Sequence, residues 1–340
     1  MPRFGGLRSA LGIVFNPRNF LEIPRLLGEG PGPVIRLFVQ AHNSAEITRL
    51  LQKGATVNFV TSFPRSGNTW ARHLLTDVFL QNCGMETGTE LPVHPDRVIP
   101  DFYCDWITLQ DVMIPTSGIY VKTHDLFERL KKRFNLPALH HCKQVYLYRA
   151  PEDALVSLYH FYEGYKYMKP RIAGGIDAFC LGQLAGWEAH LASYLGAADE
   201  GLEVFFVPYE LLLQYPTEIL SNLLRWLGNP HDSVTVDRAV SNMQFNKLQA
   251  LEARSAFNEE VVFFRRGCKG TGRAELQAAT MEQIQERASD LLARANNRVL
   301  LQQSLQRDPA PSKTCQIRWR AAMDYKRSKG LPSVPSLQKT

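Results

Sequence analysis

The chain has 340 residues, of which 45% are hydrophobic, and it carries a formal net charge of +6 with a pI near 9.0. This composition supports a large buried core and excludes a globally disordered protein. The basic balance favours an anionic partner, but no zinc-finger spacing or aromatic RNA-binding signature indicates a specific nucleic acid. Six cysteines stand singly, without a CxxC pair, so we expect reduced thiols in a cytoplasmic setting.

The first 55 residues form an N-terminal extension that prolines and glycines punctuate. Apolar spacing predicts one amphipathic helix over roughly 34–52. The opening segment is basic and then mildly apolar, but no stretch approaches the roughly 18 apolar residues of a membrane span. A peripheral membrane contact by the first 40 residues therefore stays open beside the favoured alternative, a helical flap packed on the core.

Four short apolar, β-rich runs predict strands: VNFV (57–60), GIYVKTH (118–124), QVYLYR (144–149) and EVFFVPYE (203–210). Helix-like patterns follow the first, third and fourth of them. This alternation predicts an α/β fold, a single domain over 56–304 with a central, mostly parallel sheet flanked by helices and a P-loop-like nucleotide-binding core. Ligands of such folds bind at the carboxyl ends of the strands. Residues 305–340 are predicted to be a solvated basic tail, with membrane or nucleic-acid contact as the minority alternative.

The stretch SFPRSGNTW (62–70) joins the first predicted strand to its helix. Unpaired amides at a helix N-terminus attract phosphate, Gly67 permits close backbone approach, and Arg65 adds a cation. Further donor groups come from Ser66, Asn68 and Thr69. The Walker loop GxxxxGK[ST] has its Lys after the last Gly, whereas the cation here precedes it. The pattern favours a phosphate site, and the alternative is a plain strand–helix turn with an exposed Arg.

The third predicted strand ends in Arg149, where a Walker-type NTPase would carry an acidic residue for Mg²⁺. An Arg at this position recognises an anion and cannot bind a metal. Ser157, two helical turns further on, is placed to share that anion, while Asp153 in the first turn suits a capping role. We therefore expect a second phosphate and no metal. The cationic, Gly-rich stretch VFFRRGCKGTGR (262–273) is typical of a loop over an anion, or alternatively of a flexible basic surface loop.

At these residues the sequence resembles the PAPS-dependent sulfotransferases, especially the soluble, cytosolic type. SFPRSGNTW, YLYRAPEDALVSLYHF and FFRRGCKG occur in the family's order, and VKTH at 121–124 matches the segment that carries the family's base. The ordered set spans about 57–270. The resemblance implies that the two phosphates belong to 3′-phosphoadenosine 5′-phosphosulfate (PAPS), a co-substrate used without a metal.

The resemblance also assigns the donor-binding residues by motif position. The 5′-phosphosulfate is held by Arg65, Ser66, Gly67, Asn68 and Thr69. The 3′-phosphate is held by Arg149, Ser157, Arg265, Arg266 and Gly267. Trp70 and Phe245 stack on the adenine, with Tyr209 as its neighbour; without the family, Trp70 and Phe245 would be core aromatics.

For the chemistry, the resemblance makes His124 the base that takes the acceptor's proton during in-line transfer to a hydroxyl or amine. Lys122 and Arg65 would face the bridging oxygen and the leaving phosphate, where fixed cations stabilise developing charge. The structural alternative for His124 is a hydrogen-bonded histidine at a strand end.

Several positions depart from the family's pattern. Arg65 and Arg266 replace Lys, Asn68 replaces Thr, and Asp125 follows His124 in place of Leu. Because the family's short dimerisation motif has no match, oligomeric state stays open. The acceptor, a small molecule or a glycan, would contact the aromatic-rich segments 84–117 and 161–183. The remaining alternatives are a metal-dependent P-loop nucleotide kinase or NTPase and a non-catalytic nucleotide-binding protein.

Overall fold

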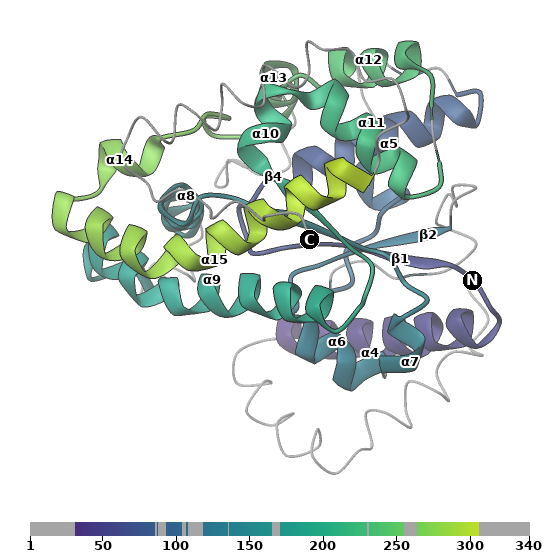
Figure 1. Ribbon diagram of the computed structural model, residues 1–340, viewed down its shortest axis with the longest axis horizontal. Coiled ribbons are helices and arrows are strands. Elements are labelled where there is room, and N and C mark those ends of the chain that lie inside the picture. The colour runs from purple at the N-terminus through teal and green to yellow at the C-terminus, as the bar shows by residue number, and fades with distance from the viewer. Residues whose placement is uncertain are drawn as a thin grey trace, which may run out of the picture. The chain divides into compact units, whose positions relative to one another are not determined.

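Among the residues that the structure describes, four parallel strands form the central sheet of this computed structural model (Figure 1). Their order across the sheet is β2-β1-β3-β4. The strands are β1 (Val57–Ser62), β2 (Ile119–Thr123), β3 (Gln144–Tyr148) and β4 (Val204–Pro208). Each falls within or extends a predicted run, and their parallel pairing confirms the α/β fold. The register aligns Thr61 with Thr123, so the carboxyl ends of β1 and β2 lie beside each other.

The structure describes residues 31–85, 87, 93–103, 107, 118–134, 136–164, 171–229, 231–254 and 264–305. The predictions for the first 30 residues, for the tail from 306 and for much of the acceptor-contacting segments lie outside these ranges. The described chain up to Val299 forms one compact unit, and 300–305 belong to a second unit of which only this helical end is described.

Helices cover both faces of the sheet (Figure 1). Successive residues along a strand point to opposite faces of the sheet. One face packs on α6 (Phe127–Phe134) and α9 (Gly175–Asp199), where the Tyr146 and Tyr194 rings stack 4.4 Å apart. The other face packs on α5 (Asn68–Asn82) and α11 (Pro216–Trp226). The remaining described elements are α4 (Pro31–Gln52), η1 (Pro95–Arg97), α7 (Leu136–Leu139), α8 (Pro151–Glu163), α10 (Tyr209–Gln214), α12 (Ser233–Asn242), α13 (Phe245–Arg254), α14 (Thr271–Glu275) and α15 (Ala278–Leu305).

Local sequence explains where these elements begin and end. All six residues of β1 are buried, as expected for a strand covered on both faces. Pro151 and Pro216 occupy the first turns of α8 and α11, where the missing amide costs nothing. The predicted helix over 34–52 is α4, which contributes Ile47 and Leu50 to the core.

No helix in the described ranges has the length and apolar character needed to cross a membrane. Four of the six cysteines lie in the described residues, and none of these four is in a disulfide: Cys83, Cys142, Cys180 and Cys268.

Candidate active site

The loop between β1 and α5 lies at the carboxyl edge of the sheet and has a backbone that only certain residues adopt. Gly67, the N-cap of α5, has φ 92°, and a Cβ built on it would lie 2.4 Å from the Tyr209 ring. Arg65 also has a positive φ, 67°. A left-handed turn directly before a helix presents the first helical amides outward, where an anion can accept from them.

Two buried side chains of this loop have polar atoms that make no hydrogen bond to another described residue. These atoms are the hydroxyl oxygen of Ser66, which is fully buried, and the amide oxygen of Asn68. Because buried polar groups are normally hydrogen-bonded, both atoms can accept a partner from a ligand or a water. The hydroxyl of Ser66 therefore fits the phosphosulfate end of PAPS.

Arg65 joins this loop to α8. Its Nε donates to the Ser157 hydroxyl at 3.2 Å, and its guanidinium lies 4.9 Å from the centre of the Phe161 ring. Burial, and then the charge of Arg149, lowers the pKa of Arg65 to about 10. Two cations close together in a largely buried place, with Glu252 acting against their effect on the pKa, are typical of a candidate anion site.

Arg149 follows β3 and is 7% exposed. Its Nη2 donates to the Cys268 carbonyl at 2.9 Å and lies 4.0 Å from the Asp153 carboxylate, and its Nη1 donates to the Arg65 carbonyl at 3.4 Å. Its Nε makes no hydrogen bond to another described residue. The guanidinium lies 4.5 Å from the centre of the Tyr209 ring. The structure thus brings Arg149 together with the loop after β1 and with the segment around Cys268.

Residues 264–270 lie outside helices and strands, as predicted, but α14 begins at Thr271, within the end of the predicted loop. The reason is Asp153, whose carboxylate accepts from the amides of Gly270 and Gly272, both at 2.7 Å, and from the Thr271 hydroxyl at 3.1 Å. This carboxylate caps α14 from another helix. The Asp153 carboxylate therefore caps α14, whereas the sequence predicts that it caps its own helix, α8.

The adenine-contact candidates are packed as follows. Trp70 is 6% exposed and its indole N–H donates to the Met243 carbonyl at 2.8 Å, while its ring meets Tyr209 edge-on. Phe245 begins α13, and a Cβ built on Gly267 would lie 2.4 Å from its ring. Gly267 has φ 56°, so glycine is needed there for conformation and for space.

His124 lies just beyond β2, beside the end of β1. Its Nδ1 donates to the Ser62 carbonyl at 2.7 Å, which fixes the proton on Nδ1 and leaves Nε2 as an acceptor. No hydrogen bond from Nε2 to another described residue is present. Burial, and then the charge of Lys122, holds the pKa of His124 well below its usual value of 6.5. A neutral imidazole with an available lone pair can accept a proton at neutral pH.

Lys122 has a carboxylate partner that sequence reasoning missed. Its ammonium donates to Asp101, and both side chains are 14% exposed. Backbone hydrogen bonds from Lys122 to Pro100 and from Phe102 to Lys122, each 2.9 Å, hold the 100–102 segment against β2. In this structure the Lys122 ammonium is therefore paired with Asp101, which lies outside the loop after β1.

Two further residues near His124 were not assigned to the site from sequence. His190 of α9 is buried; its Nε2 donates to the His124 carbonyl at 3.2 Å and its Nδ1 accepts from the Tyr146 hydroxyl at 2.9 Å. Both ring nitrogens are thus occupied, so His190 supports the end of β2. Asp125 accepts from the Tyr103 hydroxyl and lies 3.8 Å from Arg129, so its carboxylate is engaged there and not with His124.

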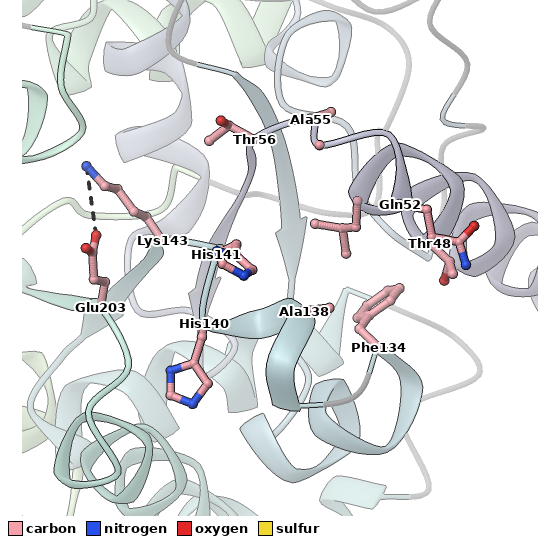
Figure 2. A pocket seen from close by; sticks show the side chains of 12 residues that line it. Thr48, Gln52, Ala55, Thr56, Phe134, Ala138, His140, His141, Lys143 and Glu203 are labelled. Atoms are coloured by element: carbon pink, nitrogen blue, oxygen red, sulfur yellow. Dashed lines mark ion pairs between the residues drawn. The ribbon is translucent and has the colours of Figure 1, made fainter.

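A cavity of about 720 Å³ lies at the opposite, amino edge of the sheet (Figure 2). It is lined by residues that precede β1, β3 and β4, and Figure 2 shows Lys143 turned toward Glu203, 3.9 Å away. None of the predicted donor or catalytic residues lines it. Within the described ranges, no group of three or more His, Cys, Asp or Glu side chains is placed to hold a metal ion.

Comparison with known proteins assigns this arrangement to a family. Residues 56–296 match the sulfotransferase domain family. A flavonol 3-sulfotransferase from Flaveria bidentis is 26% identical over 234 residues, covering 62% of this chain and 74% of the relative. Cytosolic sulfotransferase 5 from Arabidopsis thaliana is 25% identical over 61% of this chain and 71% of the relative.

Solved structures share the fold. Mouse sulfotransferase SULT7A1, complexed with PAP, has a TM-score of 0.50 and 17% identity over 69% of this chain and 83% of its own. Retinol dehydratase in complex with androsterone and PAP has a TM-score of 0.51 and 18% identity over 69% and 80%. The chain belongs to the sulfotransferase domain family and is a PAPS-dependent sulfotransferase. The predicted family and enzyme class are thereby confirmed.

Proposed function

We propose that this enzyme transfers the sulfonate group of PAPS in line to the hydroxyl of a small-molecule acceptor, without a metal ion and with His124 as the base. The observation that carries the proposal is the hydrogen bond from His124 Nδ1 to the Ser62 carbonyl. It places a neutral imidazole at the end of β2, directly beside the β1 end from which the phosphate-binding loop starts.

Different residues at the carboxyl edge would bind the different parts of the donor. Arg65 and Ser66, with the first amides of α5, would hold the phosphosulfate end. Arg149, Ser157, Arg265, Arg266 and Gly267 would hold the 3′-phosphate, and Trp70, Tyr209 and Phe245 would contact the adenine. The contacts of Arg65 with Ser157 and of Arg149 with the Arg65 carbonyl support one continuous site for both anions.

In the proposed reaction PAPS supplies the sulfonate group. His124 Nε2 takes the proton of the acceptor hydroxyl, and Arg65 stabilises the negative charge that develops on the leaving phosphate. Lys122 would contribute as a second cation once its ammonium exchanges Asp101 for the donor. His190 is the less suitable base, because neither of its ring nitrogens has a lone pair available.

The acceptor is proposed as a small molecule with an apolar ring system. Relatives and neighbours are named for a flavonol or are bound to androsterone. In this chain, Tyr162 and Phe179 lie in ring contact, and Phe161 faces Arg65, so aromatic surface adjoins the donor loop. An amine or a glycan hydroxyl is the alternative acceptor. A cytoplasmic location is proposed from relatives that are named cytosolic sulfotransferases.

The variant His124→Ala tests the proposal. We expect kcat to fall by about 10²–10⁴-fold, the usual contribution of a positioned base, while the Kd for PAP stays within about twofold of wild type. Transfer is measured with labelled PAPS and a panel of phenols and sterols, and PAP binding by calorimetry. His141→Ala, an exposed histidine on the cavity at the amino edge, is the matched control and should leave both quantities unchanged.

Three results would contradict the proposal. Full transfer by His124→Ala would remove His124 from the chemistry. Phosphoryl transfer from Mg-ATP by the wild-type chain would favour the nucleotide kinase alternative, and binding of PAP without transfer to any acceptor would favour the non-catalytic one.

A further inference from the structure

Glu275 is the carboxylate that contacts the two arginines assigned to the 3′-phosphate. Its Oε1 accepts from Arg266 Nη1 at 3.0 Å and from Arg265 Nη1 at 3.3 Å. Its Oε2 faces His160 Nε2, on the same helix as Ser157. Carboxylate and phosphate oxygens are alternative partners for the same guanidinium donors.

The helix that carries Glu275 is held firmly against α8. Asp153 caps α14 through the amides of Gly270 and Gly272. A Cβ built on Gly272 would lie 2.7 Å from the backbone of Glu152, so the two helices approach at their backbones. The Glu275 side chain is 19% exposed and lies against both arginines.

Glu275 also carries its charge under ordinary conditions. Burial alone would raise its pKa, but the hydrogen bond from His160 and the charges of His160 and Arg265 hold the pKa below its usual value. A fixed negative charge thus stands at a subsite that must accept a dianionic phosphate. Like charges at such distances repel, and the repulsion adds to the loss of the arginine contacts.

We infer that Glu275 occupies part of the 3′-phosphate subsite as an internal carboxylate, and that the donor binds by displacing it from Arg265 and Arg266. This inference rests on the proposed donor site. Glu275 then lowers the affinity of the protein for 3′-phosphorylated nucleotides, for PAPS and for its product PAP alike. Nucleotides without a 3′-phosphate make no use of this subsite and are indifferent to Glu275.

Calorimetric titration of the full chain with PAP and with AMP, which lacks the 3′-phosphate, tests the inference. Glu275→Gln should lower the Kd for PAP by about three- to tenfold, the effect of removing one partly exposed charge, and change the Kd for AMP by less than about twofold. Glu275→Ala should act in the same direction, and thermal unfolding of both variants verifies that they are folded.

Glu163→Gln is the matched control. Glu163 pairs with the other ring nitrogen of His160 and, within the described residues, has no hydrogen bond or ion pair with either arginine. Its loss should change neither Kd by more than about twofold. Wild-type binding of PAP together with an unchanged or weaker affinity in Glu275→Gln would overturn this inference alone. Failure of PAP to bind to any of the proteins would overturn the donor assignment, and the inference with it.

Discussion

The two edges of the central sheet differ in how their charged groups are satisfied. At the amino edge the cavity of Figure 2 is large, yet Lys143 donates to the Trp226 carbonyl at 2.5 Å and lies near Glu203. At the carboxyl edge Arg149 is buried and Arg65 is half-buried, the two cations repel each other, and the Ser66 hydroxyl makes no hydrogen bond to a described residue. Cavity volume therefore does not mark the candidate site; the close approach of these two cations does.

The same contrast holds for two glycines with left-handed backbones. Gly54 lines the amino-edge cavity with φ 76° and has open space where a Cβ would be. Gly67, with φ 92°, would drive a Cβ into Tyr209. At the amino edge glycine is favoured only by the left-handed backbone. At the carboxyl edge it is also required because a side chain would collide with Tyr209, a residue of the proposed site.

The largest effect that separates the two edges is expected from removing a cation at each. Arg149→Met should weaken PAP binding by about 2–4 kcal/mol, roughly 30- to 1,000-fold, because a buried charged donor set is lost. Lys143→Met should leave the Kd for PAP within about twofold and lower the free energy of unfolding by about 0.5–1.5 kcal/mol through its lost hydrogen bond. Equal losses of PAP affinity in the two variants would erase the distinction between the edges.

A smaller effect is expected from the paired glycine substitutions. Gly54→Ala should lower the free energy of unfolding by about 1 kcal/mol, the cost of a left-handed alanine, with no change in PAP binding. Gly67→Ala should lower it by a further 1–3 kcal/mol, approximately, because the methyl group overpacks against Tyr209, and PAP binding should weaken as well. Chemical denaturation and calorimetry measure both quantities. If the Gly67→Ala and Gly54→Ala proteins are equally stable, the Tyr209 ring moves aside without measurable cost, and the predicted overpacking is wrong.

Local patterns were sufficient to predict the strands and the loop between β1 and α5. VNFV and QVYLYR are short, apolar and β-branched or aromatic, and the residues around Gly67 stand between a strand and a helix, so each feature is written within a few positions of the chain. The hydrogen bond from His124 to the Ser62 carbonyl depends in addition on the pairing of β1 with β2, which these local patterns do not specify.

Contacts between distant segments could not be predicted in this way. Asp101 pairs with Lys122 from a loop 21 residues earlier, and Glu275 meets Arg265 only because α14 forms. That helix begins with Thr271 and Gly272, both of low helix propensity, and depends on Asp153, 118 residues before Thr271. Because the cap of this helix comes from a distant part of the chain, its own residues alone predict a loop.

The most direct test of the donor site is calorimetric titration of the wild-type chain with PAP, beside ATP with and without Mg²⁺. The account predicts PAP binding that does not depend on the metal and that is tighter than the binding of ATP, because Arg149 and Ser157 serve a 3′-phosphate. Preference for Mg-ATP over PAP would contradict the assignment of Arg149 and return the carboxyl edge to a metal-dependent nucleotide enzyme.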